Sequence, residues 1–293
     1  IHVPIMVMNP DERSIESILK YQLQPEIYSF RILNLLEQAM EHNPQIPDIR
    51  IHLKIDTGMH RLGFEKQNLN DILHHLTANP KIIVESVFSH FAAADDPKED
   101  TFSRQQAELL SECHDVISKH LGYTPIKHIA NSIGMIRFPE YQFDMVRLGI
   151  GLFGINPFAN PTKIENVAGM RTIISQIKVI EKGDTIGYNR QWKATDDITL
   201  AIIPIGYADG FPRSLGNGKG VVVINGHLAK IVGNVCMDMC MADITTIPAK
   251  EGDNVSVFGK DISITQFAKK ANRTEYEVLT GISQRVKRIF VQN

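Results

Sequence analysis

The sequence predicts two domains, a β/α domain with a parallel sheet over residues 1–167 and a mainly β domain over residues 168–293. Up to about residue 167, apolar runs of strand length alternate with stretches of helical period, whereas from Thr172 onward strand follows strand. The length of 293 residues suits one large domain or two smaller ones. The pattern of the first half leaves open whether its sheet is open or closed.

The elements of the first half follow from the spacing of its apolar residues. An apolar stripe over residues 32–40 predicts a helix, and alternation of apolar and polar residues over residues 51–55 predicts a strand. Further strands are expected over residues 82–88, 126–130 and 145–150, with helices over residues 69–76 and 102–121. This order is typical of a sheet whose neighbouring strands are parallel.

The second half is a succession of strands joined by short turns. Strands are expected over residues 172–180, 200–205, 221–224, 228–232, 241–244 and 255–258. Asn225-Gly226 lies between two of them and predicts a type I′ hairpin turn. Helical patterns close the chain, and Thr274 with Glu277 three residues later predicts a capping box.

The composition excludes disorder, because 43% of the residues are apolar and only 22% are charged. The formal charge of −2 is spread over a mixture of both signs, so nucleic acid and anionic membrane surfaces are not expected as partners. The sequence has no apolar run near the roughly 18 residues of a membrane span, and residues 1–5 show no signal-peptide pattern. We therefore expect a cytoplasmic protein.

The three cysteines are Cys113, Cys236 and Cys240, an odd number that cannot all pair, so a disulfide framework is not expected. The spacing of Cys236 and Cys240 is similar to that of metal ligands, but the sequence has no second such pair. No metal is therefore expected.

Polar residues gather where the predicted strands of the first half end. Residues 56–61, Ser89-His90, Asn131-Ser132 and residues 147–151 each follow a predicted strand or close one. In a β/α barrel the functional groups project from these carboxyl ends, although turn chemistry alone explains any one of the four. Four in succession predict a site.

Two of these segments suit a phosphate group. Ser132 stands directly before a short helical run and can cap that helix, while neighbouring N–H groups face an anion. Gly149 and Gly151 flank Ile150 and let main-chain N–H groups approach closely. A helix cap and a glycine-rich turn without any ligand explain the same residues equally well.

The same segments resemble the motifs of bacterial alanine racemases. The resemblance rests on six motifs in order, HLKIDTGMHRLGF (52–64), SHFAAAD (89–95), HIANS (128–132), RLGI (147–150), IGYADG (205–210) and CMD (236–238). It implies an isomerase that interconverts L-alanine and D-alanine with pyridoxal phosphate (PLP) and supplies D-alanine for peptidoglycan synthesis.

The resemblance also implies a fold and an assembly. The fold is a (β/α)8 TIM-type barrel, N-terminally incomplete here, followed by a C-terminal mainly β domain. The assembly is a homodimer whose active sites combine residues of both subunits.

Tyr207 matches the base that removes the α-proton from the L-enantiomer, contributed across the dimer interface. A phenol has a pKa of about 10, so nearby cations have to lower it, and His90 and Arg61 are the candidates. Arg61 also matches a residue that holds the substrate carboxylate or the cofactor phenolate, and the backbone N–H of Met237 reaches the same carboxylate. Without the resemblance, Tyr207 is expected to be a half-buried strand tyrosine.

Arg147 matches the residue that donates to the pyridine nitrogen of the cofactor. An arginine keeps its proton, so that nitrogen stays unprotonated and the ring is a weaker electron sink. His128 is placed to orient Arg147. The alternatives from the residues alone are a surface ion pair for Arg147 and a hydrogen-bonded core histidine for His128.

Lys54 matches a lysine that is often carbamylated in the family, which predicts a Lys54 carbamate bridging to Arg61. The alternative is an unmodified lysine whose stem packs on the helices and whose amine reaches water. The resemblance assigns the cofactor contacts to His90, Asn131, Ser132, Arg147, Gly149 and Ile150. Cys236 and Asp238, like His128 and Gln284, are expected to be supporting residues.

Gln284 stands where many family members carry a tyrosine that contributes to the cofactor phosphate and to the substrate gate. A glutamine amide still donates to a phosphate, but it has no ring to narrow a gate. The substrate range is therefore less restricted by this position.

The sequence contains no run resembling Lys-Ala-Asn-Ala-Tyr-Gly-His-Gly, which holds the Schiff-base lysine that also serves as the base for the D-enantiomer in the family. A whole barrel needs about 250 residues, so a β/α region that ends near residue 167 is roughly 80 residues short. We therefore expect a fragment of a racemase that is inactive alone. The alternatives are a PLP-binding or interaction module without catalysis and an amino-acid racemase with a broader substrate range.

Overall fold

The computed structural model describes residues 3–155 and 164–291 of the chain. Their internal contacts divide the chain into two units, Ile1–Gly149 and Ile150–Asn293, so the division comes earlier than the boundary expected at residue 167. Within the described ranges, no helix is both long enough and apolar enough to pass through a lipid bilayer.

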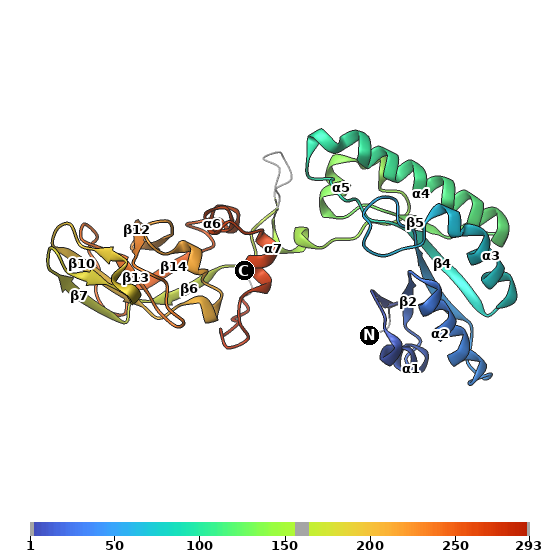
Figure 1. The fold of residues 1–293 in the computed structure, drawn as a ribbon, viewed down its shortest axis with the longest axis horizontal. Coiled ribbons are helices and arrows are strands. Elements are labelled where there is room, and N and C mark those ends of the chain that lie inside the picture. The colour runs from blue at the N-terminus through green and yellow to red at the C-terminus, as the bar shows by residue number, and fades with distance from the viewer. Residues whose placement is uncertain (1–2, 156–163, 292–293) are drawn as a thin grey trace. The chain divides into compact units, whose positions relative to one another are not determined.

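The first unit is built around a five-stranded sheet whose strands lie in chain order, each parallel to the next. The strands are β1 (Met6–Val7), β2 (Gln24–Ile27), β3 (Ile49–Lys54), β4 (Ile82–Phe88) and β5 (Ile126–His128). The helices are α1 (Ile15–Lys20), α2 (Phe30–Glu41), α3 (Leu69–Ala78), α4 (Asp100–Leu121) and α5 (Ser132–Arg137). Figure 1 shows α3 and α4 running beside β4 and β5. The predicted parallel β/α sheet is confirmed, and its described strands form about half of an eight-stranded barrel.

One face of this sheet packs against the helices. Ile51 and Leu53 of β3 are fully buried in the same core as Leu36 of α2. Burying each such side chain stabilises the unit by about 1.5–3 kcal/mol. Because alternate strand residues face opposite sides, His52 and Lys54 face away from this core. The sheet therefore has an apolar helix-covered face and a second face that carries polar residues.

The expected strand over residues 145–150 is wrong. Two backbone hydrogen bonds hold this part of the chain beside β5, from Asp144 N–H to the Lys127 carbonyl at 3.1 Å and from Arg147 N–H to the Ala130 carbonyl at 3.0 Å. The N–H of Lys127 donates to the Asp144 carboxylate at 2.7 Å instead of extending a ladder. The segment is therefore a loop, which leads into a 3-10 turn over Ile150–Phe153.

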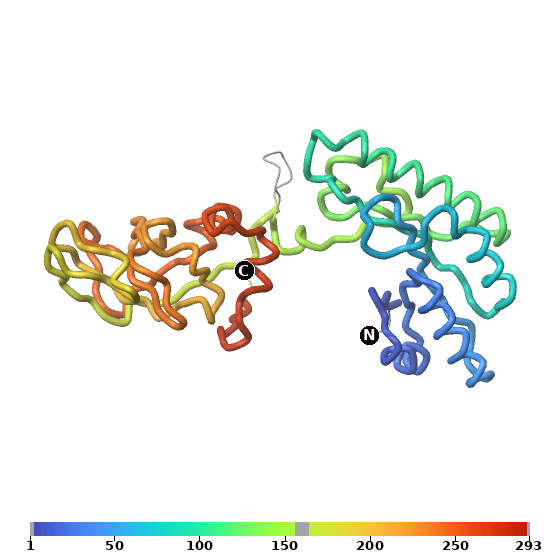
Figure 2. The backbone as a smooth tube through the Cα atoms, viewed as in Figure 1, coloured from blue at the N-terminus to red at the C-terminus, as the bar shows by residue number. Residues whose placement is uncertain are grey.

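The second unit contains a seven-stranded antiparallel sheet in the order β6-β14-β11-β12-β13-β10-β7. These strands are β6 (Met170–Ile173), β7 (Gln176–Ile180), β10 (Ile198–Ile203), β11 (Val221–Ile224), β12 (His227–Val232), β13 (Cys240–Asp243) and β14 (Asn254–Phe258). The short strands β8 (Thr185–Ile186) and β9 (Trp192–Lys193) form a separate pair, and the helices are α6 (Ile264–Ala271) and α7 (Glu275–Thr280). Figure 2 traces the backbone from the yellow strands to the red helices. The predicted mainly β domain is confirmed.

The single strand expected over residues 172–180 is two strands at opposite edges of the sheet. Ile174 N–H donates to the Asp253 carbonyl at 3.0 Å, and Ser175 N–H donates to the Ile202 carbonyl at 2.8 Å. The chain therefore passes from β14 to β10 within these two residues, so the two sheet edges approach each other there.

Two local predictions in this unit are confirmed. Asn225 and Gly226 both have positive φ, 49° and 81°, as a type I′ turn between β11 and β12 requires. Thr274 and Glu277 form the predicted capping box at the start of α7.

Candidate active site

The polar face of the first sheet carries two rows of aligned side chains. Register places Glu26 of β2 beside His52 of β3, and His52 beside Ser86 of β4. The next row toward the carboxyl ends joins Lys54, Phe88 and His128. Side chains in register on parallel strands face the same side of the sheet. All six residues of the two rows are buried.

A hydrogen-bonded chain crosses this face from Arg147 to Gln24. Arg147 Nη1 contacts His128 Nδ1, and His128 Nε2 lies 3.0 Å from Ser86 Oγ. Ser86 Oγ lies 2.6 Å from His52 Nδ1, and His52 Nε2 lies 3.1 Å from Gln24 Oε1.

The guanidinium determines the direction of the whole chain, because arginine has donors only. His128 has to accept at Nδ1, so it carries its proton on Nε2 and donates to Ser86. The Ser86 hydroxyl then donates to His52 Nδ1, and His52 donates to the amide oxygen of Gln24. Each histidine in the chain is therefore needed in its neutral form.

The Arg147 guanidinium is held from several sides. Its Nη2 donates to the Ser89 carbonyl at 2.7 Å, to the Ile129 carbonyl at 3.2 Å and to His90 Nδ1 at 3.0 Å. Burial lowers the pKa of Arg147 to about 10, and the charge of Glu26 acts in the opposite direction. Arg147 therefore remains a cation at neutral pH. It contacts His128, the residue that the resemblance implied would orient it.

The histidines of this face are neutral. Burial, together with the charges of Arg147, Lys54 and Arg61, lowers the pKa of His90 to about 4. Burial and Arg147 lower the pKa of His128 to about 2, and burial lowers the pKa of His52 to about 4 although Glu85 and Glu26 oppose it. Burial and the surrounding cations thus favour the neutral imidazole of His90, whereas the expectation for Tyr207 was a positive charge there. Arg61 remains as the expected cation.

Lys54 is paired with an acid that the sequence analysis did not single out. Its Nζ lies 3.2 Å from Glu26 Oε1, and the side chains are 5% and 1% exposed. The ammonium also lies over the Phe88 ring, 4.8 Å from its centroid. The described contacts thus place Lys54 against Glu26, while Arg61 acts on it through charge alone.

A closed loop brings Arg61 back toward Lys54. Asp56 N–H donates to the Phe64 carbonyl at 2.8 Å and Phe64 N–H donates to the Lys54 carbonyl at 2.9 Å, so the loop begins and ends at the same point of the sheet. At Gly63, with φ of 131°, an added Cβ would lie 2.6 Å from Asp56 N. This close crossing requires glycine, and it holds the exposed Arg61 beside the carboxyl end of β3.

The predicted phosphate segment is arranged differently from expectation at its helix. The cap of α5 is Asn131, whose side-chain oxygen accepts from Ile133 N–H at 3.2 Å and from Gly134 N–H at 2.8 Å. Ser132 is the first helical residue rather than the cap, and its hydroxyl accepts from Gly149 N–H at 2.9 Å. The Asn131 side chain therefore occupies two N–H groups of the first turn of α5, and the Ser132 hydroxyl occupies that of Gly149.

A tyrosine that the sequence analysis missed lies at Ile150. The Tyr276 hydroxyl of α7 accepts from Ile150 N–H at 3.0 Å. Gln284, where the resemblance placed the tyrosine contribution, is exposed. The one sequence feature that could have indicated Tyr276 is its position between Thr274 and Glu277, the two residues of the predicted capping box.

Tyr207 lies in the second unit at the start of a 3-10 turn over Tyr207–Asp209. Its N–H donates to the Cys236 carbonyl at 3.1 Å, and Ala208 N–H donates to the Met237 carbonyl at 3.0 Å. An added Cβ at Gly206 would lie 2.2 Å from the Met237 oxygen, so glycine allows these two loops to touch. Tyr207 is 45% exposed and Met237 is 54% exposed.

One arginine ties the same two loops together. Arg285 Nε donates to Asp209 at 2.8 Å, and Arg285 Nη2 donates to Asp238. Hydrogen bonds to both carboxylates raise the pKa of Arg285, so its guanidinium stays charged. The guanidinium of Arg213 lies 5.9 Å from the Tyr207 ring centroid. Arg213 belongs to the same unit as Tyr207 and places a positive charge near the phenol.

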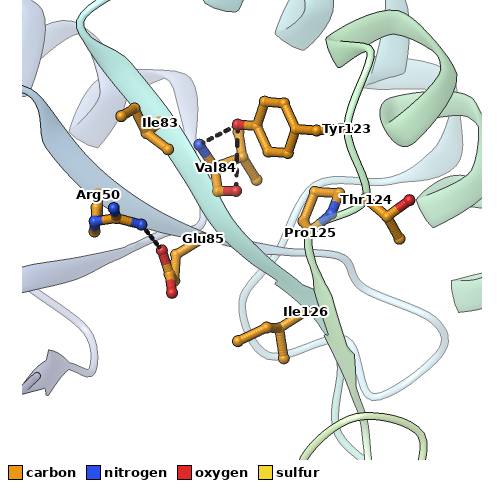
Figure 3. Close-up of a pocket in the computed structure, with 8 residues that line it drawn as sticks. All are labelled: Arg50, Ile83, Val84, Glu85, Tyr123, Thr124, Pro125 and Ile126. Atoms are coloured by element: carbon orange, nitrogen blue, oxygen red, sulfur yellow. Dashed lines mark hydrogen bonds and ion pairs between the residues drawn. The ribbon is translucent and has the colours of Figure 1, made fainter.

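A pocket at the amino ends of β3 and β4 is separate from this site. Figure 3 shows Arg50 paired with Glu85 and the Tyr123 hydroxyl bonded to both backbone groups of Val84. Active sites of β/α barrels lie at the carboxyl ends of the strands. The polar face around Arg147, and not this pocket, is the candidate site of the first unit.

Two family models match the chain, "Alanine racemase, N-terminal domain" over residues 1–157 and "Alanine racemase, C-terminal domain" over residues 167–290. An alanine racemase of Clostridium tetani is 34% identical over 306 residues, covering 100% of this chain and 78% of the relative.

Solved structures agree with these matches. An alanine racemase from D-cycloserine-producing Streptomyces lavendulae has a TM-score of 0.93 at 26% identity, covering 100% of this chain and 79% of that one. An alanine racemase of Bartonella henselae with covalently bound pyridoxal phosphate has a TM-score of 0.89 at 28% identity, covering 99% and 79%. The N-terminal family model already matches from residue 1, so the expected absence of a lysine-bearing segment is not confirmed and stays a prediction.

Proposed function

Because the chain belongs to the alanine racemase family, we propose that it interconverts L-alanine and D-alanine in a reaction that uses bound pyridoxal phosphate. The observation that carries this proposal is the assembly of family-motif residues on one polar face. Lys54, His90, His128 and Arg147 come from four separate motifs, and each contacts Arg147, Phe88 or Glu26 on that face.

The donors of this site suit the cofactor. Arg147 offers a guanidinium that stays charged, and its position between two carbonyls and two imidazoles leaves it rigid. In this proposal a phosphate takes over the N–H groups of Gly149 and Ile150, which now donate to the hydroxyls of Ser132 and Tyr276. When bound, pyridoxal phosphate would supply the electron sink that makes the α-proton of alanine acidic.

Arg147 would hold the pyridine nitrogen without transferring a proton to it. The pKa of Arg147, about 10, remains above neutral pH, so its guanidinium keeps its protons. His128, which orients Arg147, has a lowered pKa and is neutral, so it carries no proton to pass on to the ring. The residues of this chain therefore favour an unprotonated ring, which limits electron withdrawal and restrains side reactions.

Tyr207 would move the α-proton of the L-enantiomer. The loop contacts with Cys236 and Met237 fix its backbone, and Arg285 joins Asp209 of the same turn to Asp238. Arg61 and the Met237 N–H would hold the substrate carboxylate. In this proposal the subunits form a homodimer, and Tyr207 and Met237 of one subunit serve the polar face of its partner.

We further propose that the base for the D-enantiomer, the lysine that holds the cofactor, is not among the lysines of these 293 residues. The support is the absence of the expected motif and the pairing of Lys54 with Glu26. The barrel would then need strands beyond β1–β5. The physiological role would be D-alanine supply for peptidoglycan synthesis in the cytoplasm.

The proposed function is tested by following loss of the α-proton signal of alanine in heavy water by proton NMR. The chain is assayed with pyridoxal phosphate as it stands and with the coding sequence upstream of Ile1 restored. Exchange by the extended protein supports the function, and inactivity of both forms favours a binding module. Exchange of serine but not alanine favours the broader-range racemase.

A further inference from the structure

Glu26 is a buried acid that acts on two cations of the polar face. Within the described part of the chain, it is the only carboxylate whose charge raises the pKa values of both Lys54 and Arg147. Arg147, Lys54 and Arg61 are the cations that act on His90 on the same face. The buried carboxylate is therefore the local counter-charge of this cluster.

Both oxygens of Glu26 have fixed partners. Its Oε2 accepts from Asn9 N–H at 2.7 Å, in the segment that follows β1. Its Oε1 accepts no hydrogen bond from the described residues and faces the Lys54 ammonium at 3.2 Å. A buried carboxylate oxygen without a hydrogen bond is costly, so its stability depends on the adjacent ammonium.

We propose that Glu26 is a positioning residue that keeps Lys54 an unmodified ammonium, in place of a carbamate on Lys54 that bridges to Arg61. The ammonium then lies between Glu26 and the Phe88 ring, and the ring is also covered by the Arg147 guanidinium, 5.2 Å from its centroid. The Glu26 carboxylate thus provides a negative charge at the place where a Lys54 carbamate would otherwise provide one.

The chemistry of carbamylation explains why Glu26 opposes it. The neutral Nζ attacks the carbon of CO2, an N–C bond forms, one C=O electron pair moves onto oxygen, and an amine proton leaves to solvent. The lysine has to be deprotonated first, and the product is an anion. Glu26 stabilises the protonated amine, whose Nζ lies 3.2 Å from its Oε1, and it would repel an anion formed on that nitrogen. Both steps are therefore disfavoured.

Removing the charge of Glu26 reverses both effects. Burial lowers the pKa of Lys54, and Glu26 is the acid that opposes this. In Glu26→Gln the amine loses its proton more readily, and no carboxylate is left to repel a carbamate. Arg61 and Arg147 would then favour the new anion.

The test is carbon NMR of the 293-residue chain in isotope-labelled bicarbonate, compared among the wild type, Glu26→Gln and Lys54→Arg. Lys54→Arg keeps the positive charge but cannot form the carbamate. We expect no lysine carbamate signal in the wild type beyond that of Lys54→Arg, and a new signal in Glu26→Gln. Glu85→Gln is the matched control, because Glu85 lies on β4, next to the strand that carries Lys54, and pairs with Arg50. This variant should gain no signal.

A wild-type signal that Lys54→Arg removes would overturn the proposal and establish the carbamate. Equal spectra of wild type and Glu26→Gln would also overturn it, because Glu26 would then not control the amine. If Glu26→Gln does not fold, the comparison of wild type with Lys54→Arg still decides the state of Lys54. The consequence for catalysis rests on the proposed function, but this signal does not depend on activity, so the two can fail separately.

Discussion

The hydroxyl of Tyr276 accepts a hydrogen bond from the backbone N–H of Ile150 at 3.0 Å, across 126 residues of chain. Ile150 belongs to the RLGI motif, whose backbone is the proposed phosphate donor. Tyr276 lies on α7, directly inside the capping box that starts this helix. The contact places a phenol at the predicted phosphate segment, a role that the sequence analysis gave to Gln284.

Tyr276→Phe is expected to weaken the binding of pyridoxal phosphate by roughly 2- to 10-fold, the equivalent of one neutral hydrogen bond. The ring remains, so packing is preserved while the polar contact is lost. Affinity is measured by titration with pyridoxal phosphate, with Gln284→Ala as the control. A larger loss for Gln284→Ala than for Tyr276→Phe would assign the role to Gln284 after all.

Arg147→Lys is expected to lower the free energy of unfolding of the chain by about 1–3 kcal/mol. A lysine has one nitrogen, so it cannot serve His128, His90 and both carbonyls, and buried acceptors are left without donors. Urea unfolding gives the measurement. Arg50→Lys is the control, because the Arg50–Glu85 pair is half-exposed and should change stability by less than about 1 kcal/mol.

Acid is expected to destabilise the protein through its buried histidines. His52, His90 and His128 have folded pKa values lowered to about 4, 4 and 2 from 6.5, so between pH 6.5 and 4 the unfolded chain binds more protons. The free energy of unfolding therefore falls as pH decreases, by up to about 1.4 kcal/mol per pH unit for each histidine.

The histidine contribution is isolated by comparing variants between pH 6.5 and 5. His52→Gln is expected to reduce the pH slope by up to one histidine's share, whereas His227→Gln, at an exposed position of β12, should leave it unchanged. Equal slopes for the wild type and His52→Gln would show that His52 is not held neutral.

Gly206→Ala is expected to cost about 1–3 kcal/mol of unfolding free energy, because the new methyl group would overlap the Cys236 and Met237 carbonyl oxygens. The Tyr207 loop would be displaced with it. Gly169→Ala should cost less, because an added Cβ there would lie 3.3 Å from its nearest neighbour, the Phe258 carbonyl oxygen. Thermal unfolding of the two variants makes the comparison, and equal losses would contradict the close approach of these loops.

Local patterns of apolar residues predicted those strands and helices whose apolar residues also form the core. The alternation over residues 51–55 corresponds to β3 because its apolar side packs on helices that the same sequence supplies. Strand β2 is not predicted because Pro25 interrupts its pattern, and it becomes a strand through pairing with β1 and β3 on either side. Glu26 is hidden from a sequence analysis for the same reason.

Contacts between distant segments could not be predicted from spacing. The segment at residues 145–150 has strand-like composition, but Asp144 takes the Lys127 N–H that a ladder would use. The lowered pKa of His90 depends on burial and on Arg147, Lys54 and Arg61, which come from three other segments. The motif residues themselves were predicted by resemblance, and their proposed roles remain to be tested.

The most direct test of the proposed function is α-proton exchange of alanine in heavy water, catalysed by the chain extended upstream of Ile1 in the presence of pyridoxal phosphate. We expect exchange of both enantiomers, with Tyr207→Phe slowing exchange of L-alanine more than that of D-alanine, and no exchange by the 293 residues alone. Exchange by the 293 residues alone would contradict the proposal on the lysine. Absence of alanine exchange by the folded, extended protein would contradict the function itself.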